Sequence, residues 1–272
     1  MASEDNFRGA IVQLCSGENY KDNLKKVDGF IKEARKKGVS NIFLPEAFYA
    51  LSDGISPTAH LIQKGNQHEQ NLLNLAKENK VYLLGGSCAT KIGEKIFNRS
   101  YCISPEGEII SSYDKINLFR CCFKSEKQQK EIKIDEGIIY SPGGGLGCFN
   151  YSESWRMGMS ICFDIRFSEH YLALRKMGAN ILMIPSAFTK KSGKMHWHTL
   201  NKARAIEFQS FVISAAQVGQ NNERVSTYGH SLVVSPMGEI ICDLGGEKEG
   251  VEIFTLDLSD IIKARSQIMM GR

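Results

Sequence analysis

Short apolar runs alternate along this chain with longer stretches whose apolar residues recur at helical spacing. The apolar runs, which predict buried strands, cover 9–14, 41–46, 81–88, 156–162, 179–188 and 211–218. The amphipathic stretches, which predict helices, cover 19–37, 60–79, 167–177 and 196–209. This alternation predicts an α/β fold with sheets inside and helices outside, formed by residues 1–272 as a single domain.

Two stretches with the same turn chemistry, 100–115 and 229–245, predict β-hairpins. They share a pattern that reads "SPEGEII" at 104–110 and "SPMGEII" at 235–241. Proline and glycine in such positions favour a tight turn between two strands. The repetition has two explanations that the sequence leaves open. It reflects an internal pseudo-repeat of the fold, or two similar turns need the same residues.

The composition argues against charged macromolecular partners and against a membrane. Of the 272 residues, 42% are apolar and 24% are charged, which is ordinary for a globular protein. The net charge of +4 is spread over lysine pairs on predicted helices and over "KEIK" (130–133), which we expect in a loop. Such scattered charge does not predict nucleic-acid binding. No apolar run approaches about 18 residues, so no membrane span is expected.

The N-terminus, "MASEDNFRGA", has no basic region followed by an apolar stretch, so it does not resemble a secretory signal. A cytoplasmic location is therefore expected, and the eight cysteines are expected to be free thiols. The glycosylation sequon "NRS" at Asn98 would have no meaning in that compartment.

Three reactive side chains stand where predicted strands end. Glu46 ends "NIFLPE", Cys162 ends "MGMSIC", and Lys115 follows the first hairpin in "SSYDKINLF". Functional side chains of α/β proteins gather at the carboxyl ends of strands, so the three could share one pocket. An ammonium favours the thiolate, a carboxylate can accept the thiol proton, and an ammonium with a backbone N–H can stabilise an oxyanion. The trio suits attack on a carbonyl or nitrile carbon through a thioester-type intermediate.

Each of these residues also has an ordinary structural explanation. A buried cysteine usually serves packing, a glutamate after proline often caps a helix, and a lysine beside aspartate and tyrosine is usually solvated. The residues taken one by one therefore leave the function open.

Other candidate motifs favour structural interpretations. His196 and His198 could be metal ligands, but residues two apart on a helix do not face each other, so capping or packing is favoured. Cys121 and Cys122 are adjacent and lack the spacing of zinc or redox sites. "GGGLG" (143–147) is not a dinucleotide-binding fingerprint. No metal or organic cofactor is expected.

Three segments in order, "FLPEAF", "YDKINLF" and "ICFDIRFSE", resemble the catalytic signatures of the nitrilase superfamily of carbon–nitrogen hydrolases. The resemblance covers nearly the whole chain. It implies that Glu46 is the general base, that Lys115 stabilises the oxyanion, and that Cys162 is the nucleophile acylated as ammonia or an amine leaves. It also implies that the N–H of Phe163 completes the oxyanion hole.

The resemblance extends to further residues, to the fold and to assembly. Glu136 lies six residues before Pro142-Gly143, the spacing of a second glutamate that positions the lysine and the substrate amide in this superfamily. The implied fold is a four-layer α-β-β-α sandwich. The implied assembly is a homodimer or a higher homo-oligomer that packs through helices near the site.

Within the superfamily, residues 185–217 and "YGHS" (228–231) look most like the amidase branch that contains deaminated glutathione amidase and omega-amidase. We therefore expect hydrolysis of a small carboxylate-bearing amide, with deaminated glutathione favoured and 2-oxoglutaramate second. Phe188 and Thr189 would lie on a substrate-facing loop or form a helix-entry turn. Two alternatives remain: an N-carbamoyl or N-acyl amide hydrolase of the same superfamily, and a non-catalytic scaffold protein.

One region departs from the pattern of this branch. Asn117 stands where histidine is common, Arg120 stands where aspartate is common, and 121–134 is basic and unlike its usual counterpart. These departures leave the three key residues intact but put the substrate in doubt.

Overall fold

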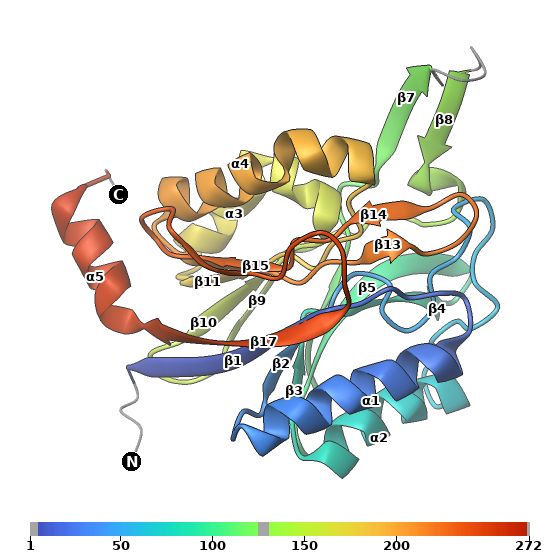
Figure 1. Ribbon diagram of the computed structural model, residues 1–272, viewed down its shortest axis with the longest axis horizontal. Coiled ribbons are helices and arrows are strands. Elements are labelled where there is room, and N and C mark those ends of the chain that lie inside the picture. The colour runs from blue at the N-terminus through green and yellow to red at the C-terminus, as the bar shows by residue number, and fades with distance from the viewer. Residues whose placement is uncertain (1–4, 125–130, 271–272) are drawn as a thin grey trace.

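Two β-sheets stacked face to face form the centre of the protein, and a pair of helices covers the outer face of each (Figure 1). The computed structural model describes residues 5–124 and 131–270. The helices are α1 (Tyr20–Lys36), α2 (Gln67–Asn79), α3 (Ser168–Lys176), α4 (Lys190–Phe208) and α5 (Leu258–Gln267). The layers run α1 and α2, first sheet, second sheet, α3 and α4. The four-layer α-β-β-α prediction is confirmed.

The first sheet has the strand order β17-β1-β2-β3-β5-β4, with β6 also paired to β5. Its strands are β1 (Asn6–Gln13), β2 (Asn41–Phe43), β3 (Tyr82–Leu84), β4 (Ser87–Ile92), β5 (Lys95–Ile103), β6 (Ile109–Asp114) and β17 (Gly250–Asp257). The last strand, β17, pairs antiparallel with β1 over its whole length, so a C-terminal segment forms the edge strand beside β1.

The second sheet has the order β16-β15-β12-β11-β10-β9. Its strands are β9 (Gly147–Asn150), β10 (Arg156–Met159), β11 (Ile181–Met183), β12 (Phe211–Ser214), β15 (Leu232–Val234) and β16 (Ile240–Asp243). Two ribbons complete the strands: β7 (Arg120–Lys124) with β8 (Glu131–Asp135), and β13 (Val218–Gln220) with β14 (Ser226–Tyr228).

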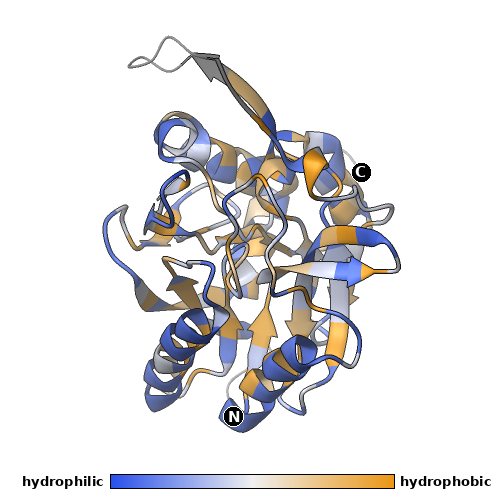
Figure 2. Cartoon of the chain, turned by 90° about the vertical axis from the view of Figure 1, so that its right-hand side faces the viewer, coloured by the Kyte–Doolittle hydropathy of each residue, from blue (hydrophilic) through white to orange (hydrophobic). Residues whose placement is uncertain are grey.

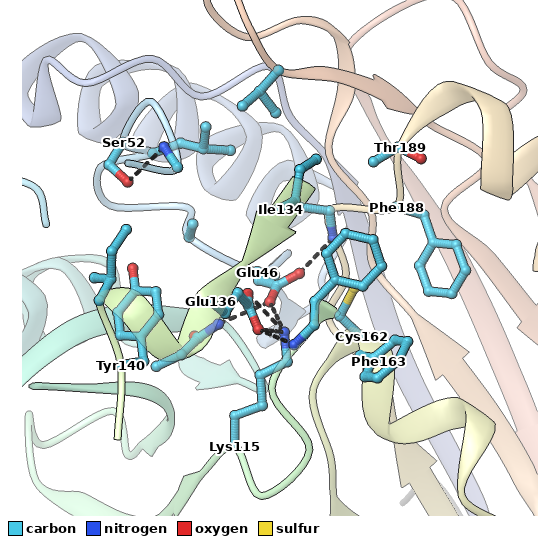
Figure 3. Close-up of a pocket in the computed structure, with 18 of the residues that line it drawn as sticks. Glu46, Ser52, Lys115, Ile134, Glu136, Tyr140, Cys162, Phe163, Phe188 and Thr189 are labelled. Carbon is cyan, nitrogen blue, oxygen red and sulfur yellow. Dashed lines mark hydrogen bonds and ion pairs between the residues drawn. The ribbon is translucent and has the colours of Figure 1, made fainter. Parts of the chain in front are cut away.

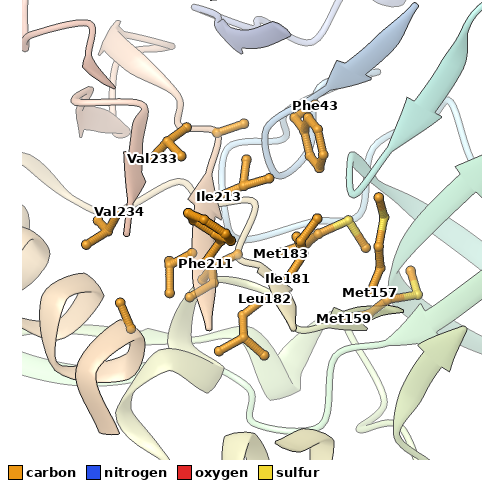
Figure 4. Close-up of a cluster of buried hydrophobic side chains, with 14 of the residues drawn as sticks. Phe43, Met157, Met159, Ile181, Leu182, Met183, Phe211, Ile213, Val233 and Val234 are labelled. Carbon is orange, nitrogen blue, oxygen red and sulfur yellow. The ribbon is translucent and has the colours of Figure 1, made fainter. Parts of the chain in front are cut away.

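The main core lies between the two sheets (Figure 4). Phe43 comes from the first sheet, and Met157, Met159 and Met183 face it from the second, all of them buried. Flexible methionine side chains fill irregular gaps between twisted sheets. A second core lies under α1 and α2. Figure 2 shows hydrophobic residues concentrated on the central strands and hydrophilic residues on the helices.

The chain repeats one topology in its two halves, which favours the pseudo-repeat explanation of the two hairpins. Strands β1, β2 and β3 are parallel and are followed by the hairpin β5–β6; strands β10, β11 and β12 are parallel and are followed by β15–β16. Both turns place glycine in the left-handed region, Gly107 at φ +79° and Gly238 at φ +84°. The same fold unit thus carries the same turn chemistry twice.

Several element boundaries differ from the sequence predictions for identifiable reasons. α2 begins at Gln67 rather than 60, because Ile62 pairs with Thr90 and Asn66 caps the helix through the N–H of Glu69. The predicted strands 41–46, 156–162 and 179–188 end earlier, at Phe43, Met159 and Met183. The chain beyond each strand turns toward the site described below.

The sequence patterns missed several elements: β7, β8, β9, β14, β17 and α5. The expectation that "KEIK" (130–133) lies in a loop is wrong for 131–133, which belong to β8, while residue 130 lies outside the described residues. Among the described residues, no helix is long and apolar enough to cross a membrane.

Candidate active site

A pocket at the carboxyl ends of the central strands brings together the four side chains that the sequence singled out. Glu46, Lys115, Glu136 and Cys162 all line it (Figure 3). Glu46 follows β2 in one sheet and Cys162 follows β10 in the other, so the pocket lies at the seam between the sheets. The expectation that strand ends deliver these groups to one place is confirmed.

Glu46 is held from three directions and is only 4% exposed. Its Oε1 accepts hydrogen bonds from Asn98 Nδ2 at 2.8 Å and from Lys115 Nζ at 2.8 Å. Its Oε2 accepts from the backbone N–H of Ala187 at 2.7 Å. These donors fix the carboxylate and satisfy it although it is buried.

Lys115 is 1% exposed and lies between two carboxylates. Its Nζ is 2.8 Å from Oε1 of Glu46 and 2.8 Å from Oε2 of Glu136, whose Oε2 also accepts the N–H of Phe119 at 2.7 Å. Burial disfavours the ammonium, but the charges of Glu136 and Glu46 outweigh it and raise the pKa of Lys115 well above its usual value. Lys115 is therefore a fixed positive charge at neutral pH.

A strained turn presents Cys162. Its φ is +48°, in the left-handed region that non-glycine residues rarely adopt. Its N–H donates to the carbonyl of Pro185 at 2.9 Å, and the chain then enters a 3₁₀ helix, Cys162–Arg166. Phe163 belongs to the first turn of that helix, whose N–H groups have no partner within it. Phe163, like Cys162, lines the pocket, and the assignment of its N–H to an oxyanion hole stays a prediction.

The charge balance of the pocket keeps the Cys162 thiol protonated at rest. Burial and the carboxylate of Glu46 raise the pKa of Cys162 well above its usual value, and Lys115 only partly offsets them. The Lys115 ammonium does lower the pKa of Cys162, as expected, but burial and the Glu46 carboxylate outweigh it. The carboxylates of Glu46 and Glu136, which both contact the Lys115 ammonium, each disfavour a thiolate at Cys162.

Asp164, which the sequence analysis did not assign a role, anchors the turn. It is fully buried, and its Oδ2 accepts from the N–H of Ile161 at 2.9 Å and from the hydroxyl of Tyr113 at 2.8 Å. Its Oδ1 accepts from both the backbone N–H and the side-chain amide of Asn117, each at 2.9 Å. Asn117 thus departs from the family pattern but joins the lysine segment to the cysteine turn.

Arg120, the second departure, lies outside the pocket lining. It opens β7 and pairs with Asp135 of β8 at 2.9 Å, with 71% of its side chain exposed. Ile134 of the same ribbon does line the pocket, so part of the unusual 121–134 segment borders it; residues 125–130 lie outside the described residues.

Phe188 and Thr189 form a helix-entry turn that also lines the pocket, while their contact with a substrate stays a prediction. Both line the pocket, and Thr189 is also the N-cap of α4, because its hydroxyl accepts the N–H of Ser192 at 3.3 Å. The capping turn therefore forms part of the pocket wall.

Several site residues escaped sequence reasoning. Asn98, whose sequon carried no meaning for glycosylation, is 5% exposed and holds Glu46. Arg166 lines the pocket, and its guanidinium lies 5.7 Å from the ring of Phe163 and 5.5 Å from that of Phe188. The only available signal was their position: Arg166 lies four residues after Cys162, and Asn98 lies on β5, the first strand of the hairpin β5–β6.

The remaining sequence candidates lie apart. His196 contacts Arg166 at 3.3 Å and does not meet His198, as the spacing predicted. Cys121 and Cys122 lie on β7, and Cys162 is the one cysteine in the pocket lining. The described cysteines are free thiols.

Comparison with known proteins places the chain in a family. Residues 8–266 match the family model of carbon–nitrogen hydrolases. A Dictyostelium discoideum protein named deaminated glutathione amidase is 36% identical over 266 residues, 94% of this chain and 89% of that protein. The human Omega-amidase NIT2 is 30% identical over 266 residues, 98% of this chain and 94% of that protein. The crystal structure of Saccharomyces cerevisiae Nit3, a member of branch 10 of the nitrilase superfamily, matches with a TM-score of 0.83 at 27% identity, covering 98% and 96% of the two chains.

The four-layer fold is that of a class of enzymes that hydrolyse carbon–nitrogen bonds. The chain belongs to the carbon–nitrogen hydrolase family, within the nitrilase superfamily. The resemblance seen in the sequence is confirmed.

The Pro142-Gly143 signature has a physical cause that predicts a variant. The N–H of Gly143 donates to the carbonyl of Lys115 at 2.9 Å, and a Cβ at 143 would lie 2.1 Å from the carbonyl oxygen of Asp114. Gly143→Ala should therefore displace the lysine segment and lower the free energy of unfolding by about 1–3 kcal/mol, measured by urea denaturation. Gly144→Ala is the matched control, because a Cβ there meets nothing within 4 Å. Equal stability of the two variants would contradict the close-approach argument.

The charge balance predicts the direction in which a second variant moves the thiol. Because the Glu46 carboxylate adds to burial in raising the pKa of Cys162, Glu46→Gln should lower that pKa. Iodoacetamide labelling of Cys162, mapped by mass spectrometry, should then begin at a lower pH than in the wild type. Glu106→Gln, at the exposed hairpin turn, is the control and should leave the labelling curve unchanged. An unchanged or upward-shifted curve in Glu46→Gln would refute this account of the resting thiol.

Proposed function

We propose that this protein hydrolyses the C–N bond of a small amide that carries a carboxylate, with Cys162 as nucleophile. The observation that carries the proposal is the buried cysteine in one pocket with a fixed ammonium and a fixed carboxylate. Deaminated glutathione is the favoured substrate and 2-oxoglutaramate the second, since relatives at 36% and 30% identity bear the corresponding enzyme names. Both compounds carry the same 2-oxoglutaryl group.

In the acylation step, the sulfur of Cys162 forms a bond to the amide carbon while its proton passes to Glu46. The carbonyl electron pair moves onto oxygen, where the Lys115 ammonium and the N–H of Phe163 stabilise it. The C–N bond then breaks, and the leaving nitrogen takes the proton from Glu46. The leaving group is ammonia for 2-oxoglutaramate and an amine for deaminated glutathione.

In the deacylation step, a water molecule attacks the thioester and gives a proton to Glu46. The C–S bond breaks, the sulfur regains that proton, and the acid product leaves. Amide and water thus yield acid and amine with the enzyme unchanged. Glu136 acts through Lys115 as a positioning residue, since it holds the ammonium at 2.8 Å.

The pocket offers a cation for the substrate carboxylate. Arg166 lines the pocket beside two aromatic rings and, among the described residues, forms no ion pair with a carboxylate. Its contact with His196, at 3.3 Å, leaves donors of the guanidinium for a ligand. A planar guanidinium pairs well with a carboxylate, which supports a carboxylate-bearing amide over a neutral one.

Homo-oligomeric assembly and a cytoplasmic location stay predictions, and size-exclusion chromatography with light scattering would measure the first. The assay below also tests the two alternative functions. These are hydrolysis of N-carbamoyl or N-acyl substrates, and a scaffold role without catalysis.

The first prediction of this proposal concerns turnover. The purified protein should form 2-oxoglutarate from deaminated glutathione or from 2-oxoglutaramate, measured with a coupled dehydrogenase, and release ammonia only from the second. Cys162→Ala should abolish both activities, and Cys122→Ala, outside the pocket, should retain them. Turnover only of carbamoyl or N-acyl compounds would replace the substrate class. No turnover of any of these amides would favour the scaffold.

The second prediction concerns carboxylate recognition. Arg166→Gln should lower kcat/KM for 2-oxoglutaramate roughly 10- to 100-fold, the worth of one charged hydrogen bond, mainly through KM. Butanamide, which lacks the carboxylate, should lose little. Arg120→Gln is the matched control, because Arg120 lies outside the pocket lining. Equal losses for both amides would show that Arg166 does not bind the carboxylate.

A further inference from the structure

Two histidines and an aspartate from separate parts of the chain converge on one spot outside the catalytic pocket. His198 lies on α4, His230 lies between β14 and β15, and Asp243 ends β16. His198 Nε2 is 2.9 Å from Asp243 Oδ2, and His230 Nδ1 is 3.0 Å from Asp243 Oδ1. The donor atoms of all three lie within 4.8 Å of one another, and none of these residues lines the pocket of Cys162.

The surrounding structure fixes His230 in this place. Its φ of +57° is unusual for a residue with a side chain. Its N–H donates to the carbonyl of Gly245 at 2.8 Å, and its carbonyl accepts from Nε1 of Trp197 at 2.8 Å. Strained backbone that is held by its neighbours is often found at binding sites. The ring of His230 is therefore oriented before any ligand arrives.

Asp243 is fixed in the same way. Its Oδ1 accepts from the N–H of Gly245 at 2.9 Å, the residue whose carbonyl holds His230. The side chains of His198, His230 and Asp243 are 32%, 23% and 24% exposed, so an ion from solvent can reach them.

We propose that His198, His230 and Asp243 bind a Zn²⁺ ion, with water as the fourth ligand. Two imidazole nitrogens and a carboxylate oxygen suit zinc, and ligand distances near 2.0–2.2 Å require donors that lie about as close together as these do. Each ring turns one nitrogen toward an oxygen of the same carboxylate, so two imidazole nitrogens and the carboxylate oxygens already face one another.

Zinc at this site would clamp α4 to the segment that carries β14–β16. The first turn of α4 includes Ser192, which lines the catalytic pocket, and the N–H of Tyr228 donates to the carbonyl of Phe188 at 3.0 Å. The ion would therefore stabilise the pocket wall formed by the start of α4, and it would not contact the substrate. Zinc binding by these three residues does not depend on which amide the enzyme hydrolyses.

The test is metal binding by the purified full chain, with Co²⁺ as a spectroscopic probe and Zn²⁺ in competition with a chromophoric chelator. Co²⁺ also reports whether thiolates bind, because thiolate ligands give an intense near-ultraviolet band that nitrogen and oxygen ligands lack. His198→Gln and Asp243→Asn each remove a ligand. His196→Gln is the matched control, two residues away on the same helix and outside the cluster. His230→Asn provides a further ligand variant, because asparagine tolerates the left-handed backbone.

We expect one ion per chain, no thiolate band, and an affinity more than about tenfold lower in each ligand variant but not in His196→Gln. Zn²⁺ should raise the Tm of the wild type and of His196→Gln, and should fail to raise that of the ligand variants. Circular dichroism without metal checks that each variant folds. No binding, a thiolate band, or equal affinity in all variants would overturn the proposal and leave the three residues as a hydrogen-bonded network.

Discussion

A buried ammonium between two carboxylates is the interaction on which the rest of the site depends. Burying Lys115 with Glu46 and Glu136 is costly unless every remaining polar atom finds a partner. The protein supplies those partners from Asn98 on β5, from the N–H of Ala187 after β11, and from the N–H of Phe119. The same network that orders the pocket therefore ties the two sheets together, so folding and catalytic geometry share one set of contacts.

This network also decides how the nucleophile can work. Burial and the nearby carboxylates oppose a resting thiolate, and a protonated thiol is a weak nucleophile. In the proposed acylation step, attack by Cys162 is therefore coupled to proton transfer to Glu46, which is fixed by three donors. Cys162 and Phe163, consecutive residues of the left-handed turn, both line the pocket. Under the proposed mechanism, the reactivity of Cys162 depends on bound substrate and is not stored in the free thiol.

Local sequence patterns were enough to predict the strand–helix alternation, and the ordered motifs were enough to single out Glu46, Lys115 and Cys162. Glu136 was accessible through its spacing from Pro142-Gly143, and the close approach of Gly143 to Asp114 explains why that position is glycine. Asn98 and Asp164 were not accessible, because their roles depend on strand pairing and on contacts across about 50 residues, 52 for Asn98 with Glu46 and 47 for Asp164 with Asn117. The paired edge strand β17 was missed for the same reason: its partner β1 lies at the other end of the chain.

The repeated topology explains why the site lies at the seam. "PEAF" (45–48) follows β2, and "PSAF" (185–188) follows β11, the second parallel strand of each half. These equivalent turns meet in the pocket, where the Glu46 carboxylate accepts the N–H of Ala187. The residue that matches Glu46 in the second half is Ser186, which is uncharged and whose hydroxyl donates to the carbonyl of Ile184 instead. The turn of the first half thus supplies the Glu46 carboxylate, and the turn of the second half supplies the Ala187 N–H that holds it. A single half could not build this site, because each turn needs the other to complete its hydrogen bonds.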